Sequence, residues 1–103
     1  MRILLAGVPF GCNNVGDEAI LECAVALFRE IAPDATLTVS TGNDDGTARR
    51  LGTETCGLFG FPGCISSDEA STLIAHHDVF VWCGATGLSD YPEVTLKFMR
   101  IAQ

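Results

Sequence analysis

A chain of 103 residues is long enough for one small domain and too short for two. Hydrophobic residues make up 48% of it and charged residues 18%, which argues against extended disorder. Thirteen acidic residues against six basic ones give a net charge of −7, so we expect no nucleic-acid partner, because contacts to phosphates need clustered Lys and Arg.

The apolar pattern predicts alternating strands and helices along the first half of the chain. Arg2–Gly7 (RILLAG) is a short apolar run that ends in glycine, which is typical of a buried parallel strand. Apolar residues then recur at helical spacing over Asp17–Ala32, until Pro33 ends the pattern. A second strand is predicted over the β-branched segment Ala35–Ser40, and a short helix around Thr47–Leu51.

The second half of the chain repeats this alternation. Thr53–Phe59 is a weaker third strand, and a capping box at Ser66 begins a helix that runs to about His77. Asp78–Gly84 (DVFVWCG) is the clearest strand, and Pro92 begins a last helix. This order predicts a Rossmann-like α/β fold, with a parallel sheet of about four strands and helices on both faces.

The last predicted helix is still periodic where the sequence stops. We therefore expect residues 1–103 to be a single domain that forms the N-terminal half of a longer protein. No apolar run approaches the roughly 20 residues that span a bilayer, so we expect no membrane span. The five cysteines are an odd number without CxxC spacing, which favours reduced thiols and a cytoplasmic location.

Two glycine-rich loops follow the first and fourth predicted strands, GCNNVGD (Gly11–Asp17) and GATGLSD (Gly84–Asp90). Ligands of a doubly wound sheet bind outside the carboxyl ends of the strands, at the point where the strand order reverses. We expect the first and fourth strands to be neighbours at that point, which would bring the two loops together. Glycines allow close backbone approach, and the amides and carboxylates of both loops suit sugar hydroxyls. The predicted substrate-binding residues are Gly11, Asn13, Asn14, Gly16, Asp17, Gly84, Thr86 and Asp90.

A dinucleotide site is one alternative for the first loop, and the spacing argues against it. Gly7, Gly11 and Gly16 do not fit GxGxxG, and no P-loop lysine follows them. Asp17 and Glu18 at the start of the helix would repel a pyrophosphate. We therefore expect no cofactor. A second alternative stays open, in which Asp17 only caps the helix and the glycines only make the turn.

Three further features have structural interpretations. Cys12 and Cys83 follow neighbouring strands, but a zinc site would need two more ligands, so we expect an unlinked pair and no metal. Trp82 lies inside a predicted strand, which favours a place in the core over a platform for stacking sugars. Arg49 and Arg50 are interpreted as solvated helix surface.

GCNNVGDEAIL (Gly11–Leu21) resembles the G-x-G-N-x-G-D-E-A-x-L signature near the start of the polysaccharide pyruvyl transferase family. HHDVFVWCGATGLSD (His76–Asp90) resembles its second signature, an apolar strand that runs into GGG-x-L-x-D, although Cys83 and Ala85 replace usual glycines. TARRLG (Thr47–Gly52) is similar to the arginine-bearing helix between them. The matching signature residues are Asn14, Gly16, Asp17, Glu18, Gly84, Leu88 and Asp90.

This resemblance covers nearly all of the chain but only the N-terminal part of the family's proteins. It implies one half of a two-domain fold similar to GT-B-like glycosyltransferases. It also implies transfer of a pyruvyl group from phosphoenolpyruvate to a sugar of a cell-surface polysaccharide, as a ketal, with release of phosphate. Asp17, Glu18 and Asp90 are then the candidates for a base that acts on an acceptor hydroxyl.

The two substrates of that reaction are expected on different halves of the enzyme. Phosphoenolpyruvate is multiply anionic and needs clustered Arg, Lys or His, which this chain lacks at its predicted strand ends. We therefore expect phosphoenolpyruvate on the missing C-terminal half and the acceptor sugar here. The alternative is a stand-alone α/β module that binds a ligand or assembles without catalysis. An exposed sheet edge would also favour homo-oligomers.

Overall fold

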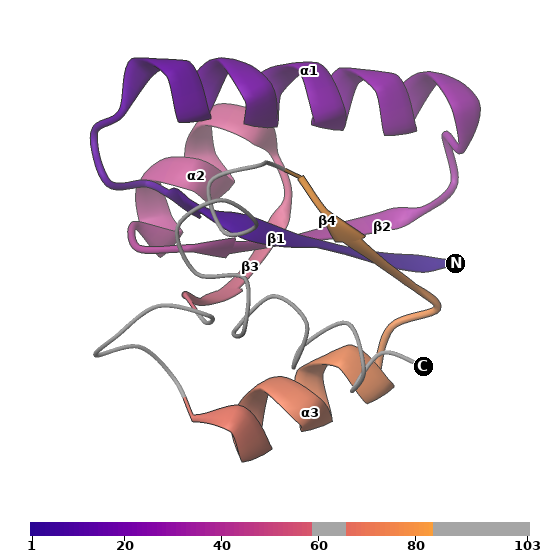
Figure 1. Cartoon of the computed structure of the whole chain (residues 1–103). Coiled ribbons are helices and arrows are strands. Elements are labelled where there is room, and N and C mark those ends of the chain that lie inside the picture. The colour runs from indigo at the N-terminus through magenta and orange to yellow at the C-terminus, as the bar shows by residue number, and fades with distance from the viewer. Residues whose placement is uncertain (59–65, 84–103) are drawn as a thin grey trace.

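The computed structural model describes residues 1–58 and 66–83, which form a parallel four-stranded sheet with helices on both faces (Figure 1). The elements are β1 (Arg2–Phe10), α1 (Val15–Ile31), β2 (Thr36–Thr41), α2 (Asp44–Leu51), β3 (Glu54–Gly57), α3 (Ser67–Ala75) and β4 (Val79–Trp82). The strand order is β3-β2-β1-β4. This confirms the predicted α/β fold and the predicted pairing of the first and fourth strands. The last predicted helix, from Pro92, lies outside the described residues.

Two hydrophobic clusters lie on opposite faces of the sheet, the larger one under α1 and the smaller one against α3 (Figure 1). Successive residues of β1 alternate between them, with Ile3 and Leu5 in the larger cluster and Leu4 and Ala6 in the smaller. These four side chains are at most 2% exposed. A strand buried on both faces is what the continuous apolar run of β1 predicts.

β1 continues to Phe10, past its predicted end at Gly7. Gly7 has a φ of +93°, and a Cβ there would lie 2.6 Å from the ring of Trp82. The glycine therefore lets the Trp82 ring lie directly against the backbone of β1, and the register between β1 and β2 shifts between Leu5 and Phe10. Trp82 packs against the smaller cluster, as predicted for a core residue.

A polar side chain caps the N-terminus of each helix in the described residues. The side chains of Asn14, Asn43 and Ser66 accept hydrogen bonds from the backbone N–H three residues on, at 3.1–3.2 Å. α1 and α2 therefore begin before the predicted starts at Asp17 and Thr47, and the N-cap of α1 is Asn14 rather than Asp17. In residues 1–58 and 66–83, no helix is long and apolar enough to cross a membrane.

Candidate functional site

The β1–α1 loop, Gly11–Asn14, is packed against the segment that follows β2. Gly11 has a φ of +79°, and a Cβ there would overlap Thr41 Oγ1 and lie 2.7 Å from the backbone nitrogen of Asn43. Thr41 Oγ1 is itself buried, accepts the Asn43 N–H at 3.1 Å and lies 2.9 Å from Thr47 Oγ1. The close backbone approach predicted at Gly11 is therefore to the protein's own buried hydroxyl network.

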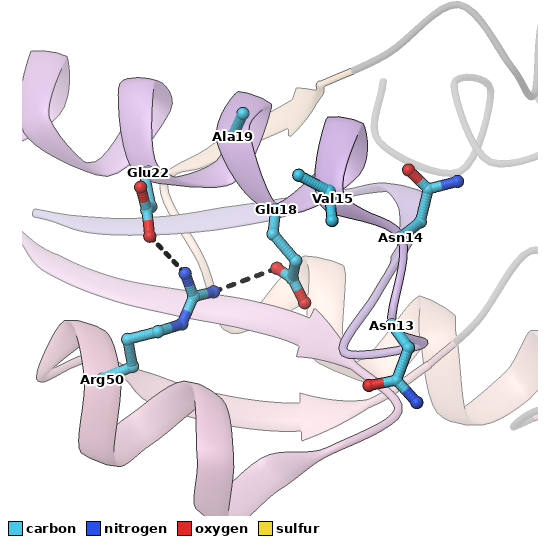
Figure 2. A pocket seen from close by; sticks show the side chains of 7 residues that line it. All are labelled: Asn13, Asn14, Val15, Glu18, Ala19, Glu22 and Arg50. Carbon is cyan, nitrogen blue, oxygen red and sulfur yellow. Dashed lines mark hydrogen bonds and ion pairs between the residues drawn. The ribbon is translucent and has the colours of Figure 1, made fainter.

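The carboxylate of Glu18 joins this loop to α2. Its Oε1 accepts the Gly11 N–H at 2.8 Å, and its Oε2 lies 3.0 Å from Nη2 of Arg50. The other guanidinium nitrogen of Arg50 pairs with Glu22, one turn further along α1 (Figure 2). Arg50 is exposed, as the sequence predicts, and its guanidinium also bridges two carboxylates and ties α2 to α1.

A pocket of about 470 Å³ opens to solvent beside this ion-pair cluster (Figure 2). Its lining residues are Asn13, Asn14, Val15, Glu18, Ala19, Glu22 and Arg50. Of the residues predicted from the sequence, Asn13, Asn14 and Glu18 belong to the lining. The other four, Val15, Ala19, Glu22 and Arg50, are not among the predicted site residues. The i, i+4 spacing of Glu18 and Glu22 was a signal for one acidic helix face, which an arginine of α2 can reach.

The remaining predicted residues are not in this lining. Gly11 is the first residue of the loop and donates its backbone N–H to Glu18, and Gly16 and Asp17 lie in the first turn of α1. Consecutive helical residues are about 100° apart, so Asp17 and Glu18 point to different sides of α1. Among the described residues, the Asp17 carboxylate makes no hydrogen bond or ion pair, although its backbone N–H donates to Asn14.

The predicted residues of the second loop, Gly84, Thr86 and Asp90, lie outside the described residues. Their place beside the β1–α1 loop stays a prediction, and so does the role of Asp90 as a candidate base. The pairing of β1 with β4 is established by the register, which runs from Ile3 opposite Val79 to Ala6 opposite Trp82.

The lining of the pocket combines charges of both signs with amides and a small apolar area. Two carboxylates against one guanidinium leave its ionised groups with one net negative charge. Glu18 is the less exposed carboxylate, with 23% of its side chain accessible against 56% for Glu22. The amides of Asn13 and Asn14 each offer donors and an acceptor, which match hydroxyl groups.

The two cysteines that follow β1 and β4 are both free thiols, as predicted. Cys12 is exposed and its sulfur lies beside Gly42, on the β2 side of β1. Cys83 packs against the larger cluster, and this burial raises the pKa of its thiol to about 11. In the part of the chain that the structure describes, no three His, Cys, Asp or Glu residues are grouped so that they could hold a metal ion.

The described residues thus define a Rossmann-like α/β domain with a polar pocket at the start of α1, between α1 and α2. Comparison with protein-family models, with curated proteins and with solved structures gives no match for this chain. The resemblance to polysaccharide pyruvyl transferases therefore rests on the quoted motifs alone.

Proposed function

We propose that this chain is the acceptor-binding N-terminal domain of a polysaccharide pyruvyl transferase-like enzyme, which transfers a pyruvyl group from phosphoenolpyruvate to a sugar. The observation that carries the proposal is the meeting of two distant segments in one pocket. Asn14 and Glu18 come from the first signature, and Arg50 comes from the arginine-bearing helix, yet all three line the same pocket. A motif that served only to begin a helix would not require this meeting.

The chemistry of the pocket supports the acceptor sugar as its ligand. Hydroxyl groups match the amides of Asn13 and Asn14, and Val15 and Ala19 supply apolar surface for a sugar ring. Phosphoenolpyruvate would face the carboxylates of Glu18 and Glu22, and the one guanidinium in the lining already pairs with both. The donor therefore fits better on the C-terminal half that the resemblance implies.

Asp17 is the first candidate for the base that takes the proton of the acceptor hydroxyl. Both oxygens of Glu18 are engaged, one by Gly11 and one by Arg50, so protonation of Glu18 would break contacts that hold the loop. The carboxylate of Asp17 has no such partner among the described residues; it lies outside the pocket lining, on a different side of α1 from Glu18, so it would act on a hydroxyl bound at the edge of the pocket. Asp90, outside the described residues, remains the second candidate.

The proposal is tested by phosphate release from phosphoenolpyruvate with candidate sugar acceptors, using the protein from its complete reading frame. We expect acceptor-dependent release, and we expect Asp17→Asn to lower kcat by about 10²–10⁴-fold with the fold intact. Asn14→Asp keeps an N-cap of equal strength but loses the amide donor, so it should raise KM for the acceptor. Unchanged kcat in Asp17→Asn would remove Asp17 from the reaction.

A binding module without catalysis is the second candidate, and the engagement of Glu18 favours it. Three residues of the signature each have a structural role that needs no catalysis. Glu18 holds the loop through the Gly11 N–H, Gly11 packs on Thr41, and Asn14 caps α1. Calorimetric titration with the same sugars separates the two candidates. Sugar binding without phosphate release supports the module, whereas release that requires the sugar supports the transferase.

A further inference from the structure

We propose that Arg50 is a positioning residue for the β1–α1 loop, which acts on Asn13 and Asn14 through Glu18 and the Gly11 amide. The consequence for acceptor binding rests on the proposed function above. The structural part, control of the loop by a residue of α2, does not depend on it. Arg50 lies far along the chain from the loop, so this control joins two separate elements of the fold.

The chain of contacts runs through the two oxygens of one carboxylate. Arg50 Nη2 lies 3.0 Å from Glu18 Oε2 (Figure 2). Glu18 Oε1 accepts the Gly11 N–H at 2.8 Å. With one oxygen fixed by Arg50, the side chain of Glu18 cannot turn away without losing an ion pair. Gly11 in turn begins the loop that carries Asn13 and Asn14 to the pocket.

Arg50 can serve as a support because α2 is anchored at both ends. Near its start, Thr47 Oγ1 lies 2.9 Å from the buried Thr41 Oγ1. At its end, Nη2 of Arg29 in α1 donates to the carbonyl oxygens of Leu51 and Gly52, at 2.5 and 3.2 Å. The guanidinium of Arg50 is therefore presented from a fixed helix, and its planar fork reaches Glu18 and Glu22 together.

Hydrogen exchange of the Gly11 amide in the complete protein tests the structural part. In Arg50→Ala we expect this amide to exchange at least about tenfold faster than in the wild type, because its charge-assisted hydrogen bond loses its support. Arg49→Ala is the matched control: Arg49 is exposed and outside the pocket lining, so its removal should leave the exchange of Gly11 unchanged. Glu22→Gln should also change it little, because Glu22 does not contact Gly11.

A merely structural tie between α1 and α2 predicts a different pattern. In that case Arg50→Ala would raise the exchange rates of the amides throughout α2 as much as that of Gly11, and this result would overturn the proposal. An equal Gly11 exchange rate in Arg50→Ala and Arg49→Ala would also overturn it. If Arg50→Ala does not fold, the exchange rate of the Gly11 amide in Arg50→Lys tests the positioning role instead. One ammonium can hold Glu18 but not both carboxylates, so we expect an exchange rate between the wild type and the unsupported loop.

Kinetics with the acceptor sugar test the functional part separately. We expect Arg50→Ala to raise KM for the acceptor by about tenfold with a smaller change in kcat, and Arg50→Lys to restore part of it. If the wild type releases no phosphate, the proposed function is wrong while the Gly11 exchange still decides the positioning role. If phosphate is released and Gly11 exchange does not respond to Arg50, only the positioning role is wrong.

Discussion

The two glycines of the first signature, Gly11 and Gly16, should respond differently to substitution by alanine. At Gly11 the φ of +79° costs a residue with a Cβ about 1–2 kcal/mol. The new Cβ would also overlap Thr41 Oγ1 and crowd the Asn43 nitrogen, and such overpacking adds about 1–3 kcal/mol because Thr41 is 2% exposed and cannot move aside. Gly11→Ala should therefore lower the free energy of unfolding by about 2–5 kcal/mol.

Gly16 is the matched control within the same motif. It lies in the first turn of α1 without a positive φ, and a Cβ there would approach only Asn14 Oδ1, at 3.3 Å. Alanine gains about 0.5–1 kcal/mol over glycine in a helix, and a small shift of the Asn14 side chain offsets part of this gain. Gly16→Ala should therefore leave the free energy of unfolding unchanged or raise it by less than about 1 kcal/mol.

Urea denaturation followed by circular dichroism measures both effects. With a total stability of about 5–15 kcal/mol and an m-value of about 2 kcal/mol/M, Gly11→Ala should lower the midpoint by about 1–2.5 M. A midpoint for Gly11→Ala within 0.2 M of the wild type (about 0.4 kcal/mol at that m-value) would refute the packing argument. A stable Gly16→Ala with a raised KM for the acceptor would instead show that Gly16 contacts the ligand.

Two further predictions concern α1 and the thiols. Leu21 is fully buried, so Leu21→Ala should lower the free energy of unfolding by about 2–5 kcal/mol. Leu27 is 53% exposed, so Leu27→Ala should lower it by less than about 0.5 kcal/mol. Equal losses of stability for the two variants in urea denaturation would contradict the orientation of α1. Burial raises the pKa of the Cys56 and Cys83 thiols from 9.0 to about 11, with the charge of Asp44 adding to the shift at Cys56. The unfolded chain loses these protons first, so the stabilisation is present below pH 9 and is lost as the pH rises toward 11; urea midpoints that do not fall over this window would contradict it.

The fold was predictable wherever a sequence pattern had a single physical meaning. The apolar run of β1 predicted a strand buried on both faces, and the capping box at Ser66 predicted the start of α3. The errors fall at glycines. The sequence pattern predicts the end of β1 at Gly7, where the strand instead continues and the missing side chain admits the Trp82 ring. It predicts Gly16 in the preceding loop, whereas Gly16 lies inside α1. A glycine marks freedom of the backbone, and only the tertiary structure shows how that freedom is used.

The candidate site was predictable only in part, because its members come from separate elements. Asn13, Asn14 and Glu18 follow the first strand. In a Rossmann-like fold, ligands bind outside the carboxyl ends of the strands, so these residues are expected near a ligand. Arg50 joins them because α2 packs beside α1, which brings its guanidinium to Glu18. A contact between residues this far apart in the sequence cannot be predicted from a local sequence pattern. Only the contacts of each carboxylate show that Glu18 holds the loop and that Asp17 does not.

The most direct test of the central claim is the dependence of phosphate release on the acceptor. Initial rates of phosphate release from phosphoenolpyruvate are measured with the complete protein at increasing acceptor sugar, and the pyruvylated sugar is counted by mass spectrometry. The account predicts a rate that saturates with the acceptor and one phosphate for each ketal formed. Saturable binding of the sugar with no phosphate released above the background without protein would contradict it.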